Sequence, residues 1–194
     1  MDAIKVLKDD HKTVEGLFKK FESAGDRAHK TKRKLVDQII TELSVHAAIE
    51  EQVFYPGVRA SVSKAEDLVL ESLEEHHIVK WTLSELENMD PQDERFDAKV
   101  TVLMESVRHH VKEEEKEMFP KVRKAMKAAD LKDLGARLVQ AKVAAPKRPH
   151  PKAPDEPPGN LVAGPGGAVV DAGKDLAREV VGTASGRKRG GSRR

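Results

Sequence analysis

The sequence predicts an all-α protein whose main part is an antiparallel up-down-up-down four-helix bundle. Apolar residues recur at steps of three and four over four long segments, which is the spacing of one buried helix face. The connections between these segments are only a few residues long, which favours antiparallel neighbours. No window shows sustained alternation of apolar and polar residues, so no sheet is expected.

The four predicted helices lie within residues 1–127, which we expect to form one domain. Their apolar faces span residues 4–21, 35–53, 69–86 and 96–118. Gly25 is expected to end the first helix, and Asp90-Pro91 follows the third. Tyr55-Pro-Gly57 is expected to end the second helix, because proline cannot continue the backbone hydrogen-bond ladder.

The remaining residues divide into a short extra helix and a tail. Residues 128–144 are predicted to be helical, with Asp130 as the N-cap. Residues 145–194 are rich in proline and glycine, are basic and contain no aromatic residue, so they are expected to be mostly disordered. Residues 168–181 have the spacing of a transient helix. Residues 187–194 form a basic tip that could contact nucleic acid or an acidic protein.

Composition excludes several classes of protein. The 194 residues include no cysteine, which removes disulfide scaffolds, thiol nucleophiles and cysteine-bound metal clusters, so any metal must rest on His, Asp or Glu. Lys and Arg number 35 against 33 Asp and Glu, so net charge alone indicates no partner. No segment has the length and apolarity of a membrane span or a signal peptide, which predicts a cytoplasmic protein without membrane contact.

The predicted bundle repeats itself. The segment from His46 to Pro56 aligns with the segment from His110 to Pro120, and Asp10-His11 aligns with Glu75-His76. The bundle is therefore expected to consist of two copies of a helical hairpin.

Each predicted helix places one histidine in the middle of its apolar face, and two of them add a glutamate one turn later. The six residues are His11, His46, Glu50, His76, His110 and Glu114. One histidine on such a face is more often an ordinary core residue, but four in register are unusual. Buried carboxylates without partners are costly, and a bound cation would remove that cost. Four imidazoles and two carboxylates suit a pair of divalent ions with the glutamates as bridges.

Other histidines and motifs carry less information. His77 and His109 lie about 100° around their helices from the apolar faces, and His29 and His150 are expected at the surface. The sequence contains no His-Glu-x-x-His zinc motif, no glycine-rich phosphate loop and no nucleophile elbow. Trp81 is expected in the core.

These residues resemble the hemerythrin-like, or HHE cation-binding, domain family. The resemblance covers about residues 1–127 and rests on four motifs, which are Asp10-His11, His46 with Glu50-Glu51 and Tyr55-Pro56, Glu75-His76, and His109-His110 with Glu114-Glu115 and Phe119-Pro120. It implies a non-haem di-iron centre with His11, His46, His76 and His110 as terminal ligands. Glu50 and Glu114 would be the bridges, with Glu115 as a rival to Glu114.

The chain departs from the oxygen-carrying members of that family. Ser72 and Lys80 lie one turn either side of His76, where those carriers have a further histidine. Glu15, one turn after His11, could supply an extra carboxylate. A centre poor in imidazole is expected to favour the ferric state, and hence oxidation or peroxide chemistry over reversible O₂ carriage.

The sequence therefore predicts a cytoplasmic protein with two carboxylate-bridged iron ions that binds or reacts with O₂, peroxide or NO. Oxidative stress response, sensing and iron handling all fit this prediction, and peroxide decomposition or iron oxidation would be the enzymatic form. The alternative is a helical scaffold with a structural metal, whose basic tail binds a partner or nucleic acid.

Overall fold

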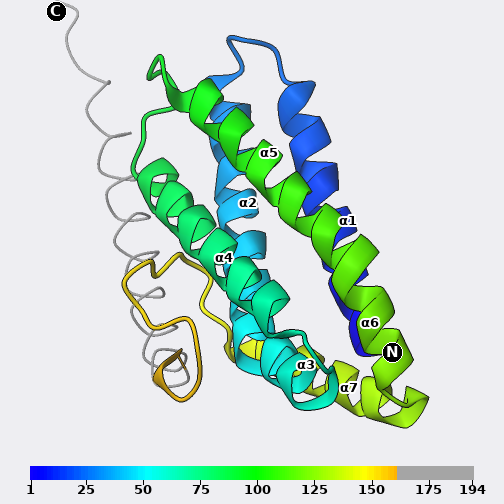
Figure 1. Ribbon diagram of the computed structural model, residues 1–194. Helices are drawn as coiled ribbons and strands as arrows, with labels where there is room; N and C mark the ends of the chain where they lie inside the picture. The colour runs from blue at the N-terminus through cyan, green and yellow to red at the C-terminus, as the bar shows by residue number, and fades with distance from the viewer. Residues whose placement is uncertain (161–194) are drawn as a thin grey trace, which may run out of the picture.

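The computed structural model describes residues 1–160 and shows a four-helix bundle with a further helix across one end (Figure 1). The bundle helices are α1 (Ala3–Glu22), α2 (His29–Ile49), α4 (Glu66–Glu87) and α5 (Phe96–Glu113), and the crossing helix is α7 (Ala128–Ala144). The described residues contain no strand and no helix long and apolar enough to cross a membrane. The predicted all-α bundle is therefore confirmed.

Two of the bundle helices continue past a proline, and one of these prolines, Pro56, was expected to end its helix. α2 passes into the π-helical turn η1 (Glu50–Phe54) and then α3 (Tyr55–Ser61), and α5 likewise passes into η2 (Glu114–Met118) and α6 (Phe119–Ala125). In η1 the backbone N–H of Tyr55 donates to the carbonyl of Glu50, five residues back. Pro56 then occupies the first turn of α3, where a missing N–H costs nothing. The expected stop at Tyr55-Pro-Gly57 is therefore wrong.

An acidic residue lies at the start of both α1 and α7, but only the one at α1 caps its helix. The Asp2 side chain accepts a hydrogen bond of 2.8 Å from the backbone N–H of Lys5 and so caps α1. α7 begins at Ala128, and its cap residue Lys127 has extended backbone without a side-chain hydrogen bond. Asp130 is thus not the N-cap. It lies in the first turn of α7, where its negative charge faces the positive end of the helix dipole.

The apolar core divides into two clusters with a polar layer between them. One cluster, which includes Phe18, Ile39 and Phe96, fills the end of the bundle near the α1–α2 and α4–α5 connections. The other, which includes Leu7 and Phe54, fills the end that α7 covers. On α1, His11 lies between Leu7 of one cluster and Val14 of the other. The polar layer is therefore enclosed by apolar packing on both sides.

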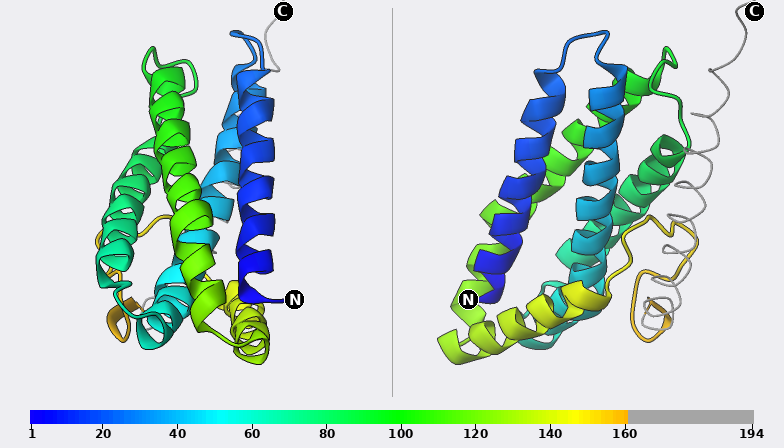
Figure 2. Two further views of the ribbon diagram at one scale, coloured as in Figure 1. Left: turned by 45° about the vertical axis from the view of Figure 1, so that its right-hand side comes forward. Right: turned by 180° about the vertical axis from the view of Figure 1, so that it is seen from behind.

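α7 closes the end of the bundle beneath this layer (Figure 2). It packs against α1, α2 and η1. A Cβ atom at Gly135 would lie 2.5 Å from the carbonyl oxygen of Met1, so only glycine permits this approach of α7 to the start of α1. Leu134 reaches within 3.2 Å of the Cβ position of Gly57. The added helix is thus an integral part of the core.

Residues 145–160 pack against the bundle, contrary to the expectation of disorder from residue 145. Arg148 pairs with Glu87 at 2.7 Å, Arg59 pairs with Glu156 at 3.0 Å, and Lys80 pairs with Asp155. Proline restricts the unfolded chain, so ordering this segment costs less entropy than its composition suggests. The expected transient helix at 168–181 and the basic tip at 187–194 lie outside the described residues.

Candidate metal centre

The four histidines on the apolar faces meet inside the polar layer. His11, His46, His76 and His110 come one each from α1, α2, α4 and α5, and their side chains are only 4–6% exposed. The rings of His11 and His46 lie 4.9 Å apart between centroids, and those of His76 and His110 lie 4.8 Å apart. The Nε2 atoms of His76 and His110 are 3.2 Å apart.

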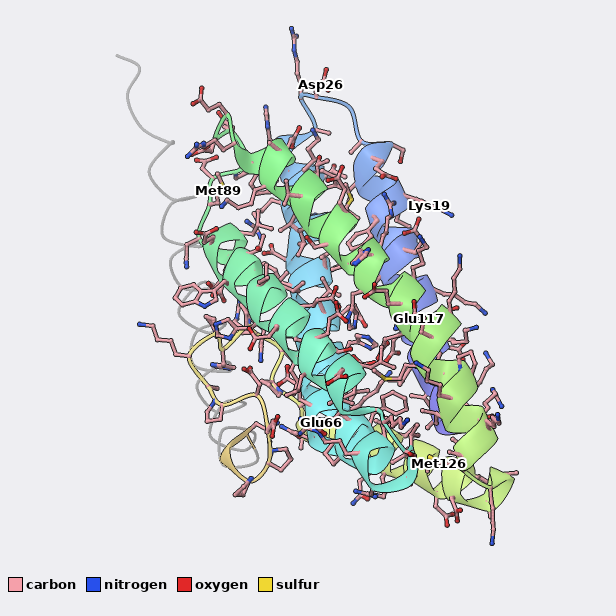
Figure 3. All side chains as sticks on the ribbon, viewed as in Figure 1. Lys19, Asp26, Glu66, Met89, Glu117 and Met126 are labelled. Carbon is pink, nitrogen blue, oxygen red and sulfur yellow. The ribbon has the colours of Figure 1, made fainter. Side chains whose placement is uncertain are left out.

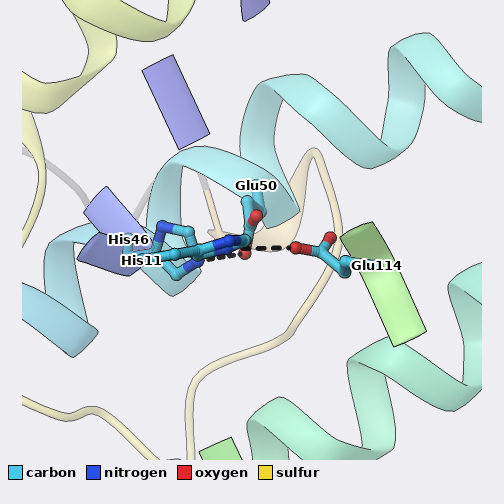
Figure 4. A group of neighbouring side chains, drawn as sticks. All are labelled: His11, His46, Glu50 and Glu114. Atoms are coloured by element: carbon cyan, nitrogen blue, oxygen red, sulfur yellow. Dashed lines mark ion pairs between the residues drawn. The ribbon is translucent and has the colours of Figure 1, made fainter. Parts of the chain in front are cut away.

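Two buried glutamates from the π-helical turns face these histidines, and Figure 4 shows both glutamates with His11 and His46. Glu50 Oε2 lies 3.1 Å from His46 Nε2 and 3.4 Å from His76 Nε2. Glu114 Oε2 lies 3.4 Å from His11 Nε2 and 3.9 Å from His110 Nε2. Each glutamate therefore reaches one histidine of its own hairpin and one of the other hairpin.

The six residues divide into two groups with the spacing of metal ligands. His11, His46, Glu50 and Glu114 form one group, and Glu50, His76 and His110 form the other, each with ligand atoms within 4.8 Å of one another. Two ligands at about 2.1 Å from one cation are separated by roughly 3–3.5 Å for tetrahedral or octahedral angles, and the observed separations are close to this. Glu50 belongs to both groups, as a bridging carboxylate would.

The centre also contains buried polar atoms that lack a hydrogen-bond partner. They include both carboxylate oxygens of Glu50, Glu114 Oε2, His11 Nε2 and both ring nitrogens of His46. Among the described residues no lysine or arginine forms an ion pair with Glu50 or Glu114. Leaving such atoms without a partner costs several kcal/mol in total. The donor set therefore fits bound cations.

The charges in this centre are strongly coupled when no cation is present. Burial raises the pKa of Glu50 well above its usual value, and the charge of Glu114 raises it further. Burial acts in the same direction on Glu114, but hydrogen bonding to His11 and the nearby histidine charges outweigh it and lower the pKa to about 2. Burial lowers the pKa of His46 to about 4 and that of His76 well below its usual value. Neutral imidazoles are the form that binds metal.

A second layer of carboxylates faces the outer nitrogen of each histidine. The Nδ1–carboxylate distances are 3.0 Å for His11–Glu115, 3.5 Å for His46–Asp10, 3.1 Å for His76–Glu51 and 2.7 Å for His110–Glu75. Carboxylates in this position fix the orientation of a metal-binding histidine and increase its basicity. The sequence analysis did not assign this role, although an acidic neighbour beside each histidine or glutamate in the repeat was the available signal.

Glu114 has the position of a bridging ligand, and Glu115 does not. Glu114 points into the centre and is 1% exposed, whereas Glu115 lies behind His11 and is 29% exposed. Glu15, the suggested extra carboxylate, binds Arg108 at 2.9 Å and is not part of the centre.

Tyr55 is a further member of the centre that the sequence analysis missed. Its hydroxyl lies 3.3 Å from Glu114 Oε1, to which it donates, and 3.3 Å from His76 Nε2. Phe119, the equivalent residue of the second hairpin, stacks on His11 with ring centroids 6.0 Å apart. The alignment of Tyr55 with Phe119 in the repeat was the signal that could have identified this position.

Several residues outside the centre also differ from expectation. Trp81 is 44% exposed rather than in the core, and its Nε1 donates to His77 Nε2 at 3.0 Å. His29 is partly buried, with Nδ1 3.0 Å from the carbonyl oxygen of Pro91. His150 is also partly buried. His109 lies outside the centre and is 60% exposed, as its position on α5 predicts.

Comparison with known proteins gives a consistent result. Residues 2–122 match the hemerythrin HHE cation binding domain. An uncharacterized hemerythrin-like protein of Schizosaccharomyces pombe is 27% identical over 168 residues, which cover 86% of this chain and 82% of that protein. A DNA nickase of Nostoc is 29% identical over 118 residues, which are 61% of this chain but only 32% of that protein. The crystal structure of a hemerythrin HHE cation binding domain-containing protein from Mycobacterium kansasii aligns with a TM-score of 0.62 and 27% identity, covering 74% of this chain and 88% of that one.

Proposed function

Because the chain belongs to the hemerythrin HHE cation-binding domain family, we propose that it holds two iron ions and that this centre binds or reacts with O₂, peroxide or NO. His11, His46, His76 and His110 would be the terminal ligands, and Glu50 and Glu114 the bridges. Zinc and manganese accept the same donors, so iron rests on the family. When bound, iron supplies the electrons for chemistry on an oxygen or nitrogen-oxide ligand.

The observation that carries this proposal is the position of Glu50. It is fully buried, its two oxygens have no hydrogen-bond partner, and it belongs to both ligand groups. A single cation would leave one of the two groups without its charge partner. Two cations sharing Glu50 would satisfy both groups.

The space beside the histidines supports a small ligand. A cavity of about 20 Å³ touches the rings of all four histidines and is otherwise lined by apolar side chains, among them Val14, Val79 and Val107. A cavity of this size holds about one water molecule. Its small size and apolar lining exclude a charged or extended substrate, which supports a ligand as small as O₂, NO or hydrogen peroxide.

The residues around His76 support reaction over reversible O₂ carriage. Ser72 donates to the carbonyl of Leu68, and Lys80 binds Glu51 at 2.9 Å, so neither replaces the missing imidazole. The donor set is then four imidazoles and two carboxylates, and losing an imidazole increases the share of carboxylate oxygen, which stabilises the ferric state. Repeated loading and release of O₂ without conversion to the ferric form would contradict this part of the proposal.

Elemental analysis of protein purified without added metal tests the proposal. We expect about two irons per chain, peroxide consumption in proportion to iron content, and loss of both in His46→Ala but not in the control His29→Ala. A chain that holds no metal and takes up none from ferrous iron without oxygen would disprove the proposed centre. If metal removal unfolds the chain and the loaded protein reacts with none of the three ligands, the alternative of a structural metal replaces it.

A further inference from the structure

A further group of potential metal ligands, separate from the two groups of the buried centre, lies on the outer surface of α4 and α5. His109 Nε2 is 3.3 Å from Glu113 Oε1 and 3.8 Å from Glu75 Oε1, and the three ligand atoms lie within 4.8 Å of one another. His109 and Glu113 are one helical turn apart on α5. The side chains are 60%, 34% and 23% exposed for His109, Glu113 and Glu75, so an ion can reach them from solvent.

The geometry of this group is compatible with a shared cation. One imidazole nitrogen faces two carboxylate oxygens at separations close to those of ligands that share a metal ion. Glu75 is already held in place, because its other oxygen accepts a hydrogen bond of 2.7 Å from His110 Nδ1. A ligand that is fixed before binding loses less entropy when the ion binds.

The surface group is not a product of the internal repeat. Its equivalents in the first hairpin are Asp10, Val45 and Ile49. Ile49 is buried, and Val45 packs against the same apolar cluster. The first hairpin therefore has no matching group, and only the second hairpin presents these ligands to solvent.

We infer that Glu75, His109 and Glu113 bind a divalent transition-metal ion, and that this surface site is where iron enters the buried centre. The second part rests on the proposed function. Glu75 connects the two sites, because one oxygen faces His109 and the other holds His110, so a surface ion lies one side chain from a ligand of the centre. Exposed Glu71 and Glu117, one turn beyond Glu75 and Glu113, raise the local concentration of cations.

Zinc is the probe for the surface site, measured by equilibrium dialysis against micromolar zinc and elemental analysis. His109→Ala is expected to bind about one ion fewer per chain than the wild type. His77→Ala is the matched control, since His77 neighbours His76 as His109 neighbours His110, and it should keep the wild-type count. Circular dichroism verifies that each variant is folded.

The number of zinc ions bound per chain shows whether the surface site or the buried centre fails. Equal zinc binding by His109→Ala and the wild type would overturn the surface site. A wild type that binds a single ion, which His109→Ala loses, would keep the surface site and overturn the buried centre instead.

Anaerobic uptake of ferrous iron tests the entry role. His109→Ala and Glu113→Gln should fill the buried centre several-fold more slowly than the wild type, and the final iron content of the buried centre should be the same in all three proteins. Uptake at the wild-type rate in both variants would overturn the role in iron entry.

Discussion

The two helical hairpins, α1 to α3 and α4 to α6, place the same chemical groups at equivalent positions but surround them differently. In each, a histidine of the first helix has an acidic neighbour, and a π-helical turn on the second helix supplies two glutamates. The first hairpin has Tyr55 where the second has Phe119. The common groups explain why two ligand groups face each other in the bundle, and the differences predict that the two proposed ion positions are not equivalent.

The carboxylates that lie behind the histidines also have different surroundings in the two halves of the bundle. Glu51, behind His76, is 6% exposed and binds the buried Lys80 at 2.9 Å. Its counterpart Glu115, behind His11, is 29% exposed and binds Lys8, itself 40% exposed, at 2.9 Å. Figure 3 shows how densely charged side chains cover the outside of these helices. The contrast gives four predictions, which begin with the largest expected effect.

Glu50→Gln should remove most of the bound metal, because Glu50 belongs to both ligand groups and glutamine cannot supply the charge. Glu115→Gln should keep the full metal content, since Glu115 lies behind His11. Elemental analysis of both variants, expressed and purified together, makes the comparison. Full metal content in Glu50→Gln would show that the shared position is not a bridge.

Lys80→Ala should lower the free energy of unfolding by about 3 kcal/mol, because it leaves the buried carboxylate of Glu51 without its charge partner. Lys8→Ala removes an exposed partner of Glu115 and should cost less than about 1 kcal/mol. Urea denaturation of the metal-free proteins measures both. Similar costs would mean that the two outer carboxylates are equivalent.

The contributions of Glu51 and Glu115 to the free energy of unfolding should change with pH in opposite directions in the metal-free protein. Burial raises the pKa of Glu51 to about 7, so its contribution to stability falls as the pH rises from its ordinary value of 4.5 to about 7, by roughly 3 kcal/mol. Burial also acts upward on Glu115, but hydrogen bonds from His11 and Lys8 outweigh it and lower the pKa. The contribution of Glu115 is therefore present above pH 4.5 and is lost as the pH falls.

Stability measured against pH distinguishes the two carboxylates. Glu51→Gln should reduce the decline between pH 4.5 and 7, to which Glu50 with its raised pKa also contributes, and Glu115→Gln should reduce the loss below pH 4.5. A Glu51→Gln profile that declines as steeply as the wild type between pH 4.5 and 7 would contradict the assignment.

Exchanging the two aromatic residues should have the smallest effect. Tyr55→Phe removes the hydroxyl that lies between His76 and Glu114 and should change the free energy of unfolding by about 1 kcal/mol. Phe119→Tyr places a hydroxyl beside His11 in the other half. Denaturation of the two single variants and the double variant shows whether the hydroxyl can move between halves, and identical curves for all proteins would mean that Tyr55 makes no net contribution.

Much of the fold follows from local sequence. The periodicity of apolar residues located α1, α2, α4 and α5, because one buried face requires that spacing. The same periodicity separated His76 and His110, which are buried, from His77 and His109, which are not. The six residues predicted to be ligands lie together because they share one level of the bundle, although their binding of metal awaits the experiments above.

What the sequence could not supply depends on contacts between distant segments. The pairing of His11 with Glu115 joins two different hairpins, so the acidic neighbour of Glu114 in the sequence does not by itself identify the histidine that it faces. The π-helical turns were missed because a widened turn lets a helix continue past a proline that would otherwise end it. The packing of residues 145–160 depends on ion pairs with Arg59, Lys80 and Glu87, which composition does not reveal.

Each hairpin supplies two carboxylates to a histidine of the other hairpin, and this arrangement indicates how the chain evolved. His11 receives Glu114 and Glu115 from the second hairpin, and His76 receives Glu50 and Glu51 from the first. A single hairpin with one such histidine and one such pair of glutamates could complete the full set only by meeting a second copy about a twofold axis. The centre thus has the pattern of a symmetric homodimer whose two subunits became one chain by gene duplication and fusion, after which each half was free to change its surroundings separately.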